Sequence, residues 1–315
     1  MRFIEKIKKL NSNKYISLLV KVTITILFFI TVNRKIEFSR LIELFSTIKI
    51  YAIFPVIIFG FLNILFHVGR WHLLLQTSKI SDSKRVAWIT ILWGTLLAFI
   101  TPGRVGELFR GNGIIASDSK KMFFSVLIDK IFTIVVLLIF GVVSFFIKEL
   151  FYKSYVTNVE FYFIVSLIAI SIIVPFVIRL APKIKFLRGV YNLLSDYKYL
   201  SVQDKWRVTL FSIAEYIALI AETVLLFRAL GILNLKDCAL SVLTAYAVMP
   251  FISVSIGGMG VREGSFAFFM NATAQYDVNQ IATASLGASL IILVVNLLIP
   301  SIIGGVWFWI EKKEV

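Results

Sequence analysis

The chain has 315 residues, of which 59% are hydrophobic and only 16% are charged, and its mean hydropathy is +0.89. Soluble domains carry roughly 45–50% apolar and about 25% charged residues, so this composition excludes a soluble globular fold and predicts an all-α, polytopic integral membrane protein. The net charge of +15 would suggest nucleic acid as a partner of a soluble protein, but no nucleic-acid motif is present. Lys and Arg instead gather beside the apolar runs, where they set topology and meet anionic lipid heads.

Apolar runs near the length of a membrane span recur along the chain. Six are predicted to cross the bilayer fully, at residues 15–32, 51–66, 122–147, 161–180, 209–230 and 281–310. The first follows a basic segment and is too long for the core of a signal peptide, so we expect a retained span, a cytoplasmic N-terminus and a place in the cell (plasma) membrane.

The remaining basic segments fix the orientation of the other spans. The basic stretch 183–207, with 186–199 as a helix on the inner membrane surface, and the tail with Lys312 and Lys313 are also expected in the cytoplasm. Segment 33–49 conflicts with this scheme, because it contains four Lys and Arg residues although the span count places it outside.

Two further apolar segments are interrupted by glycine. Residues 86–100 end at the letters TPG (101–103), and residues 239–256 end at GGMG (257–260). Because Pro and Gly stop a helix and the freed backbone groups must face protein or water, each segment predicts a re-entrant hairpin. The span count makes the two hairpins enter from opposite sides, so that 51–147 and 207–310 form inverted repeats. Paired breaks of this kind point to a substrate site at the membrane midplane of a transporter.

We therefore predict one domain over 1–315. Residues 1–50 supply an N-terminal span and a connector, and residues 148–206 link the two repeats through a span and the surface helix.

Charged residues follow the first break at three-residue spacing. Arg104 and Glu107 are neighbours on a short helix, as are Glu107 and Arg110. Free backbone N–H groups at Gly103 and Gly106, together with the arginines, would suit a phosphate. The alternative is an ion pair that neutralises itself inside the bundle.

The second break has the same composition. Arg262 and Glu263 follow glycines that would allow a phosphate to approach the backbone, namely Gly257, Gly258 and Gly260. The alternative is that these glycines serve close helix packing.

Three more acidic residues lie within apolar runs. Glu215 and Glu222 are seven residues apart and share nearly one helix face, where they could line a polar path, pair with the hairpin arginines or form a structural ion pair. Asp129 could pair with Arg104 or Arg110. Two basic residues, Arg70 and Lys130, are interpreted as anchors at the membrane interface.

No cofactor or metal is predicted. The single cysteine, Cys238, cannot form an internal disulfide, and His67 and His72 are five residues apart rather than the four of a helical zinc pair. No phosphate-binding P-loop is present, so we expect no ATP hydrolysis.

Four motifs occur in an order that resembles the lysylphosphatidylglycerol synthase transmembrane family. PGRVGELFR (102–110) is similar to its P-G-R-x-G-E-x-x-R signature, and SIGGMGVREG (255–264) to its G-G-x-G-x-R-E signature. GRWHLLL (69–75) resembles its R-W-x-x-L-L stretch, and SVLIDK (125–130) its S-V-x-x-[DE]-[RK] stretch. Together the motifs cover most of the chain.

The resemblance implies a domain that flips lipids. In multiple-peptide-resistance proteins this module moves aminoacylated phosphatidylglycerol between leaflets and is followed by further spans and an aminoacyl-transferase domain. This sequence stops at Val315, so the resemblance predicts transport rather than lysyl transfer. Stand-alone relatives are also implicated in handling lipid-linked sugars, which leaves the cargo open.

The leading hypothesis is translocation of an anionic lipid without ATP, with membrane lipids as partners. Arg104, Arg110 and Arg262 would bind the phosphate, and Glu107 and Glu263 would orient the arginines. A second hypothesis is a membrane-embedded transferase that uses a lipid-phosphate donor, with Glu107, Glu263 or Asp129 as its base. A third is an accessory subunit of a lipid-modifying enzyme or a glycosyltransferase.

Overall fold

A computed structural model of the chain describes the positions of most residues after the first 45. The described residues are 46, 48, 50–101, 104–111, 114, 119–151, 200–232, 234–252, 258, 260–271 and 276–314. Every regular element among them is helical: α4 (Ile50–Thr77), α5 (Lys84–Ile100), η1 (Val105–Phe109), α6 (Ser119–Phe151), α9 (Val202–Ala229), α10 (Leu235–Ile252), α11 (Val261–Asn271), α12 (Val278–Leu293), η3 (Val294–Leu298) and α13 (Ile299–Glu314).

Within the described part of the chain, four helical stretches are long and apolar enough to cross a membrane. They are Tyr51–Thr77, Lys121–Leu150, Val202–Ala229 and Val278–Ile310, and they contain four of the six predicted spans. The polytopic helical membrane architecture is thereby confirmed. The predicted spans at 15–32 and 161–180, the surface helix at 186–199 and nearly all of segment 33–49 lie outside the described residues.

The outer surface of these helices is apolar. Large hydrophobic side chains are exposed along three of them: Phe54, Ile57 and Phe61 on α4, Val135, Ile139, Val143 and Phe146 on α6, and Ile302, Val306 and Trp309 on α13. Contiguous apolar surface on this scale is rare on soluble monomers. It is the surface that a bilayer requires, since lipid tails then replace a protein partner.

Side-chain oxygens determine where several helices begin and end. Ser83 caps α5 by accepting a hydrogen bond from the Val86 amide, and Asp277 caps α12 by accepting from the amides of residues 279 and 280. At the other end of α5, the Thr101 hydroxyl donates to the Leu97 carbonyl at 2.6 Å and accepts from the Gly106 amide at 2.8 Å. Thr101 thus ties the first turn of η1 back onto α5.

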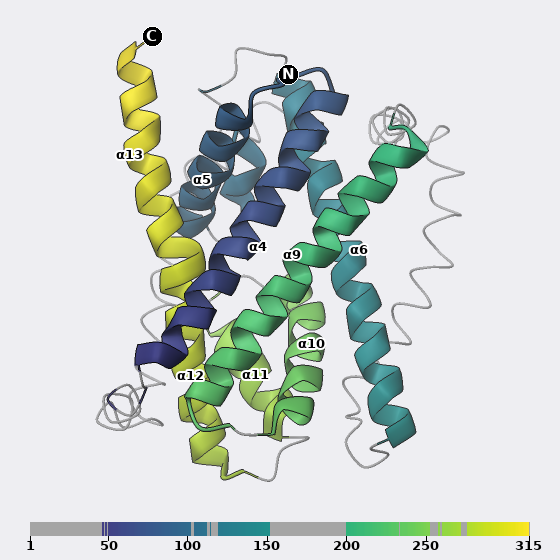
Figure 1. Cartoon of the computed structure of the whole chain (residues 1–315), viewed down its shortest axis with the longest axis vertical. Helices are drawn as coiled ribbons and strands as arrows, with labels where there is room; N and C mark the ends of the chain where they lie inside the picture. The colour runs from purple at the N-terminus through teal and green to yellow at the C-terminus, as the bar shows by residue number, and fades with distance from the viewer. Residues whose placement is uncertain are drawn as a thin grey trace, which may run out of the picture.

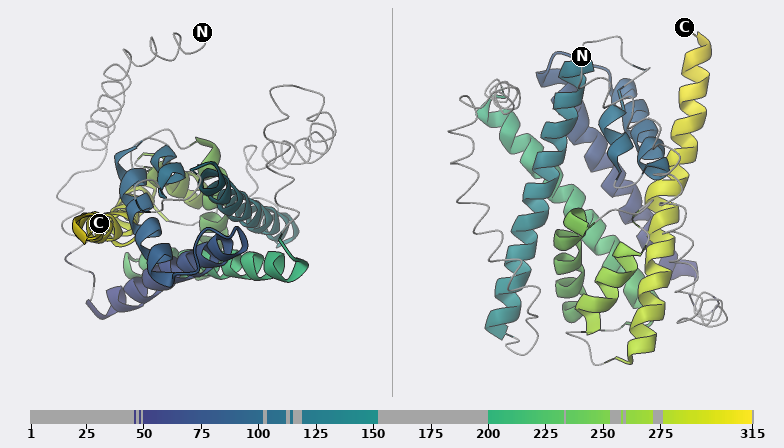
Figure 2. Two further views of the ribbon diagram at one scale, coloured as in Figure 1. Left: turned by 90° about the horizontal axis from the view of Figure 1, so that it is seen from above. Right: turned by 180° about the vertical axis from the view of Figure 1, so that it is seen from behind.

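The helices form a bundle in which two short helical pairs lie in opposite halves. Helices α4 and α9 run side by side on one face (Figure 1). Seen from behind, α5 lies in the upper half and the pair α10–α11 in the lower half, with α6 on one side and α12–α13 on the other (Figure 2). Accordingly α6 packs against α10, α11 packs against α12, and α13 packs against α5. Residues far apart in sequence therefore meet at the centre of the bundle.

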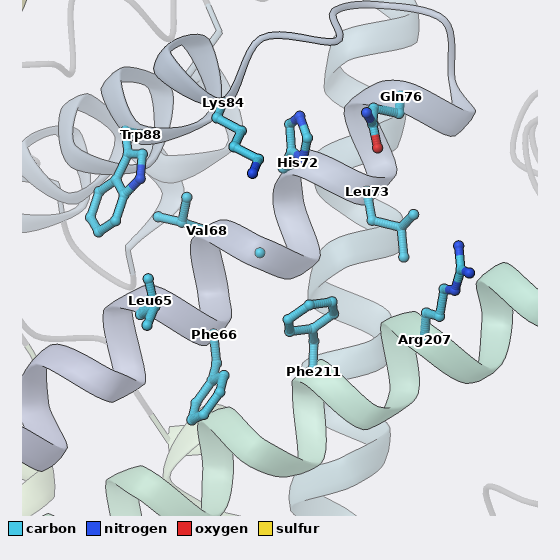
Figure 3. A pocket seen from close by; sticks show the side chains of 11 residues that line it. Leu65, Phe66, Val68, His72, Leu73, Gln76, Lys84, Trp88, Arg207 and Phe211 are labelled. Carbon is cyan, nitrogen blue, oxygen red and sulfur yellow. The ribbon is translucent and has the colours of Figure 1, made fainter.

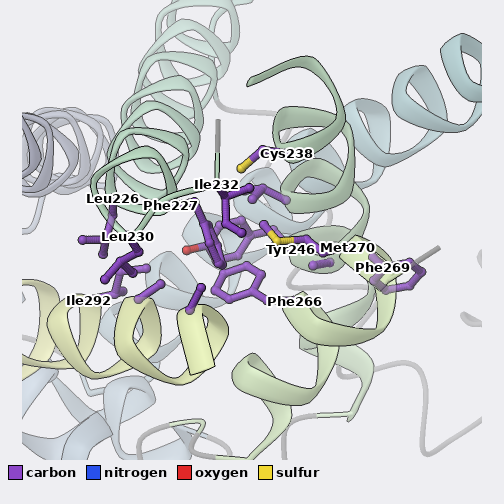
Figure 4. Close-up of a cluster of buried hydrophobic side chains, with 14 of the residues drawn as sticks. Leu226, Phe227, Leu230, Ile232, Cys238, Tyr246, Phe266, Phe269, Met270 and Ile292 are labelled. Carbon is purple, nitrogen blue, oxygen red and sulfur yellow. The ribbon is translucent and has the colours of Figure 1, made fainter. Parts of the chain in front are cut away.

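Each half has its own hydrophobic core. In the lower half, aromatic rings from α9, α10 and α11 meet edge to face: the ring centroids of Phe227 and Phe266 are 5.3 Å apart, and those of Tyr246 and Phe266 are 5.4 Å apart (Figure 4). In the upper half, the buried cluster surrounds Trp71 and includes Leu74 from α4 and Val126 from α6. These cores hold the helices at fixed positions.

Close contact between α13 and α5 depends on Gly304. A Cβ atom at this position would overlap the backbone of Leu92 and lie 2.8 Å from the Trp93 amide nitrogen. We expect Gly304→Ala to lower the apparent melting temperature in detergent, because separating two packed backbones costs about 1–3 kcal/mol. Gly264→Ala is the matched control, since a Cβ there meets nothing within 4 Å. Equal melting temperatures for the two variants would contradict this account of the helix contact.

Candidate functional site

A buried carboxylate, Asp129 of α6, joins charged residues from three elements. Its Oδ1 accepts from Arg70 Nε of α4 at 2.6 Å, and its Oδ2 accepts from Arg110 Nη2, which follows η1, at 3.0 Å. His67 Nε2 lies 3.3 Å from the same Oδ2. The side chains of Asp129 and Arg110 are fully buried, and that of Arg70 is 1% exposed. Asp129 thus neutralises two guanidinium groups inside the bundle.

Arg70 also connects this centre to α9. Its Nη1 forms an ion pair with Glu215 Oε2 and donates to Ser212 Oγ at 3.2 Å. His67 Nδ1 lies 3.6 Å from Glu215 Oε1, so the imidazole stands between two carboxylates. The contact between α4 and α9 is therefore stabilised by an ion pair as well as by apolar packing.

Glu107 of η1 forms the second acidic centre. Lys130 Nζ lies 2.6 Å from its Oε1, Arg110 Nη1 lies 3.7 Å from the same oxygen, and Arg104 Nη2 lies 3.5 Å from Oε2. Arg104 immediately precedes η1 and has φ 58°, a left-handed conformation uncommon outside glycine. The Glu107 side chain is 3% exposed, whereas that of Arg104 is 50% exposed. Arg104 is therefore the exposed arm of the cluster.

Arg110 is enclosed by residues of α4, α5 and α6, although its Nε atom has no hydrogen-bond partner among the described residues. Its guanidinium carbon lies 3.5 Å from the ring centroid of Trp71, and the Trp71 indole donates to Thr90 at 2.8 Å. Gly94 of α5 allows this approach, because a Cβ there would lie 2.5 Å from the Arg110 Cβ. Arg110, which was predicted to bind a phosphate, is thus packed as a structural cation. Its charge is neutralised by Asp129.

These residues form a network with an excess of positive charge. Its cations are Arg70, Arg104, Arg110 and Lys130, and its carboxylates are Glu107, Asp129 and Glu215. Four Arg and Lys side chains thus face three carboxylates in this set of residues. An anion that reached the exposed side of Arg104 would complete the charge balance.

The second set of predicted residues lies at the start of α11. Arg262 Nη1 donates to the Ser289 carbonyl of α12 at 3.3 Å, and Glu263 Oε2 accepts from the Gly260 amide at 2.6 Å. Gly258 and Gly260 both have positive φ, of 73° and 86°, which non-glycine residues rarely adopt. Here glycine is required by the turn itself.

The two predicted acidic residues of α9 belong to different sets. Glu215 joins the network of Arg70, whereas Glu222 is fully buried and accepts a hydrogen bond from Asn296 Nδ2 at 2.7 Å. Although Glu215 and Glu222 share nearly one helix face, they do not belong to the same site.

The predicted backbone anion donors are only partly described. Gly103 and Gly257 lie outside the described residues. The Gly106 amide donates to Thr101, and a Cβ at Gly106 would overlap the Leu97 backbone, so this glycine serves the packing of η1 on α5.

Sequence reasoning missed Arg70, His67 and Lys130 as members of the network. Arg70 and Lys130 were predicted to be interfacial anchors, but Arg70 is buried and Lys130 pairs with Glu107. The signal that could have found them was the number of acidic residues within apolar runs. Three carboxylates there require cations, and buried charges in membranes are generally paired.

An open cavity lies between α4, α5 and α9. It has a volume of about 520 Å³ and is lined mainly by apolar side chains such as Leu65, Trp88 and Phe211, with Lys84 and Arg207 at its edge (Figure 3). None of the predicted site residues lines it. Among the residues that the structure places, no group of three or more His, Cys, Asp or Glu could hold a metal ion.

Bundle and network together define a polytopic helical membrane protein with a buried ionic centre next to a helix break. The sequence matches the family described as "Lysylphosphatidylglycerol synthase TM region" over residues 18–304. The chain therefore belongs to this family, and the resemblance inferred from the four motifs is confirmed. No curated protein and no solved structure shows significant similarity to the chain.

Replacing Asp129 tests the importance of charge neutralisation for folding. Asp129→Asn would leave Arg70 and Arg110 together without their shared counter-ion, and breaking a buried ion pair costs about 3–5 kcal/mol. We expect a large fall in the apparent melting temperature in detergent. Glu149→Gln, at an exposed position near the end of the same helix, should leave it unchanged.

A second substitution separates charge from shape. In the double variant Asp129→Asn with Arg110→Leu, one uncompensated cation is removed, so part of the lost stability should return. No recovery in the double variant would show that Asp129 stabilises the bundle through something other than its charge.

Proposed function

We propose that this chain moves an anionic lipid head group between the two leaflets without hydrolysing ATP. The observation that carries the proposal is the network with one cation in excess and a half-exposed Arg104. Helix α5 has 17 residues and advances about 25 Å along its own axis before η1 begins, so Arg104 lies well inside the length of the bundle. A cation held at such a depth in a membrane protein is generally functional.

The surroundings of Arg104 favour an amphipathic anion over a soluble one. Its neighbours Val105 and Phe109 on η1 are large apolar residues with exposed fractions of 53% and 47%. A lipid would offer phosphate to the guanidinium and hydrocarbon to these side chains. A free inorganic anion would leave them without a partner.

We further propose that α5–η1 and α10–α11 are re-entrant hairpins that enter from opposite sides, which would add to six full spans. This is supported by their positions in opposite halves of the bundle (Figure 2). It is also supported by the left-handed turn that precedes each short helix, at Arg104 and at Gly260. In this arrangement Arg104 and Arg262 would each accept the head group from one side.

A transferase receives less support from the same geometry. A general base needs a free carboxylate lone pair near the substrate. Glu107 and Asp129 are surrounded by cations, and Glu263 accepts the Gly260 amide. The network is arranged to neutralise charge rather than to abstract a proton from a substrate.

The charges at one end of the bundle support an orientation in the plasma membrane. Lys79, Lys84, Arg85, Lys205 and Arg207 all lie at the end where α4 finishes and α9 begins. We propose that this end faces the cytoplasm, because short cytoplasmic loops carry the excess of Lys and Arg. The C-terminal end of α13 lies at the same end of the bundle (Figure 1).

Arg104→Gln tests the anion site. Loss of a charge-assisted hydrogen bond costs about 1.5–3 kcal/mol, so we expect head-group transfer to slow by about tenfold or more. The measurement is the movement of fluorescent phosphatidylglycerol between leaflets of proteoliposomes, followed by quenching of the outer leaflet. The apparent melting temperature should stay near that of the unmodified protein, because half of the Arg104 side chain is exposed.

Arg207→Gln is the matched control for this experiment. Arg207 lies at the basic end of α9, away from the network, and its side chain is 59% exposed. Its substitution by Gln removes the same charge from the chain. Equal transfer rates for Arg104→Gln and Arg207→Gln would overturn the assignment of Arg104 as the head-group ligand.

Cysteine labelling tests the proposed orientation. Because Cys238 is the only cysteine, Cys238→Ala gives a background free of thiols. In that background we expect Asn279→Cys to react with an impermeant maleimide in intact cells, and Lys84→Cys to react only after permeabilisation. Both positions are exposed and lie at opposite ends of the bundle. The reverse labelling pattern would mean that the basic end faces outward.

A further inference from the structure

Two buried oxygens without hydrogen-bond partners lie close to the same point of α4, where α4, α9 and η3 meet. Glu222 Oε1 and Asn296 Oδ1 are both buried, and neither has a hydrogen-bond partner among the described residues. A Cβ atom built on Gly60 would lie 3.0 Å from each of them, so both oxygens converge on the same point of α4. The second polar atoms of the two groups form a hydrogen bond, in which Asn296 Nδ2 donates to Glu222 Oε2 at 2.7 Å.

The local backbone is irregular at this point. Asn296 lies on η3, a π-helical stretch of five residues between α12 and α13. Such stretches widen a helix by one residue per turn and occur frequently at functional sites. Here the irregular turn directs the Asn296 amide towards α9.

An ionised Glu222 would be poorly satisfied in this position. A buried carboxylate with a single hydrogen bond is strongly disfavoured, and its second oxygen has no donor, while Asn296 Oδ1 near the same point of α4 is another acceptor. A neutral carboxylic acid resolves both problems. Its O–H on Oε1 can donate to Asn296 Oδ1 while Oε2 accepts from Nδ2, which gives a cyclic pair of hydrogen bonds.

We propose that Glu222 is a proton-binding site of the membrane interior, held in its protonated form by Asn296. When water reaches the site, the O–H bond breaks, the proton passes to water and Glu222 is left as a carboxylate. Reprotonation from the other side restores the cyclic pair. The proton would thereby accompany the anionic head group and offset its charge, a role that rests on the proposed transport function.

Other titratable groups near Glu222 have different partners. Arg262 of α11 interacts with it electrostatically but donates to the Ser289 carbonyl, and Tyr246 of α10 hydrogen-bonds Thr223 at 2.9 Å. On α4, His67 and Arg70 lie two or more turns beyond Gly60. They engage Glu215 and, on α6, Asp129. Lys148 of α6 contacts Thr244 and the ring of Phe269.

Infrared spectroscopy of the purified protein in lipid nanodiscs tests the protonation directly. We expect a carbonyl band of a neutral carboxylic acid at neutral pH, which Glu222→Gln removes and Glu149→Gln retains. Asn296→Leu should shift this band, because it removes the amide that pairs with the acid. Absence of the band, its persistence in Glu222→Gln, or a sodium-dependent carboxylate signal at Glu222 would overturn the proposal.

A transport measurement then tests the coupling. Under an imposed pH gradient across proteoliposomes, transfer of fluorescent phosphatidylglycerol should accelerate severalfold for the unmodified protein and for Glu149→Gln. Glu222→Gln should lose this acceleration. Transfer rates that do not change with the pH gradient in any of the three proteins would overturn the proposed coupling. If the unmodified protein moves no lipid at all, the transport function fails, while the infrared band still decides the state of Glu222.

Discussion

The structure depends on the neutralisation of two arginines by one aspartate inside an apolar bundle. Arg70 and Arg110 come from opposite sides of Asp129, and all three side chains are removed from solvent. An unpaired charge at this depth in a bilayer costs at least about 2.5–3.5 kcal/mol, and considerably more without relaxation. Pairing reduces this penalty, but a hydrophobic contact of the same size would avoid it altogether. The two buried arginines therefore depend on Asp129, and the three side chains have to be kept together for the bundle to form.

The two halves of the bundle handle polar groups in different ways. In the half that contains α5 and η1, cations and carboxylates form a connected network with an excess of positive charge. In the half that contains α10 and α11, a buried carboxyl group, Glu222, meets a neutral amide. Seven residues separate Glu215 from Glu222, a rise of about 10 Å along α9, so this helix connects an ionic centre with a neutral one.

Much of the architecture could be predicted from hydropathy, because a long apolar run with few charges has few alternatives to crossing a membrane. The breaks after 100 and before 261 were also readable, since Pro and Gly interrupt helices for local reasons. The network was less accessible. Arg70 lies near a basic loop and resembles an interfacial anchor in sequence. Only the packing of α4 against α9 brings it to Glu215. The π-helical turn at Asn296 left no recognisable pattern, because it depends on packing against α4 and α9 rather than on local propensity.

If the site carries an anionic head group, as we propose, it must release this cargo as well as bind it, and the geometry around Glu107 offers a way to do both. Lys130 Nζ is closer to Glu107 than Arg104 is, at 2.6 Å against 3.5 Å, although the two cations approach different oxygens. Arg104 can therefore leave Glu107 for an arriving phosphate without leaving a bare carboxylate behind. When the phosphate departs, Glu107 is still in place to receive the guanidinium. Competition between a fixed carboxylate and a mobile anion keeps binding weak enough to be reversible, which a deep, fully enclosed arginine such as Arg110 could not achieve.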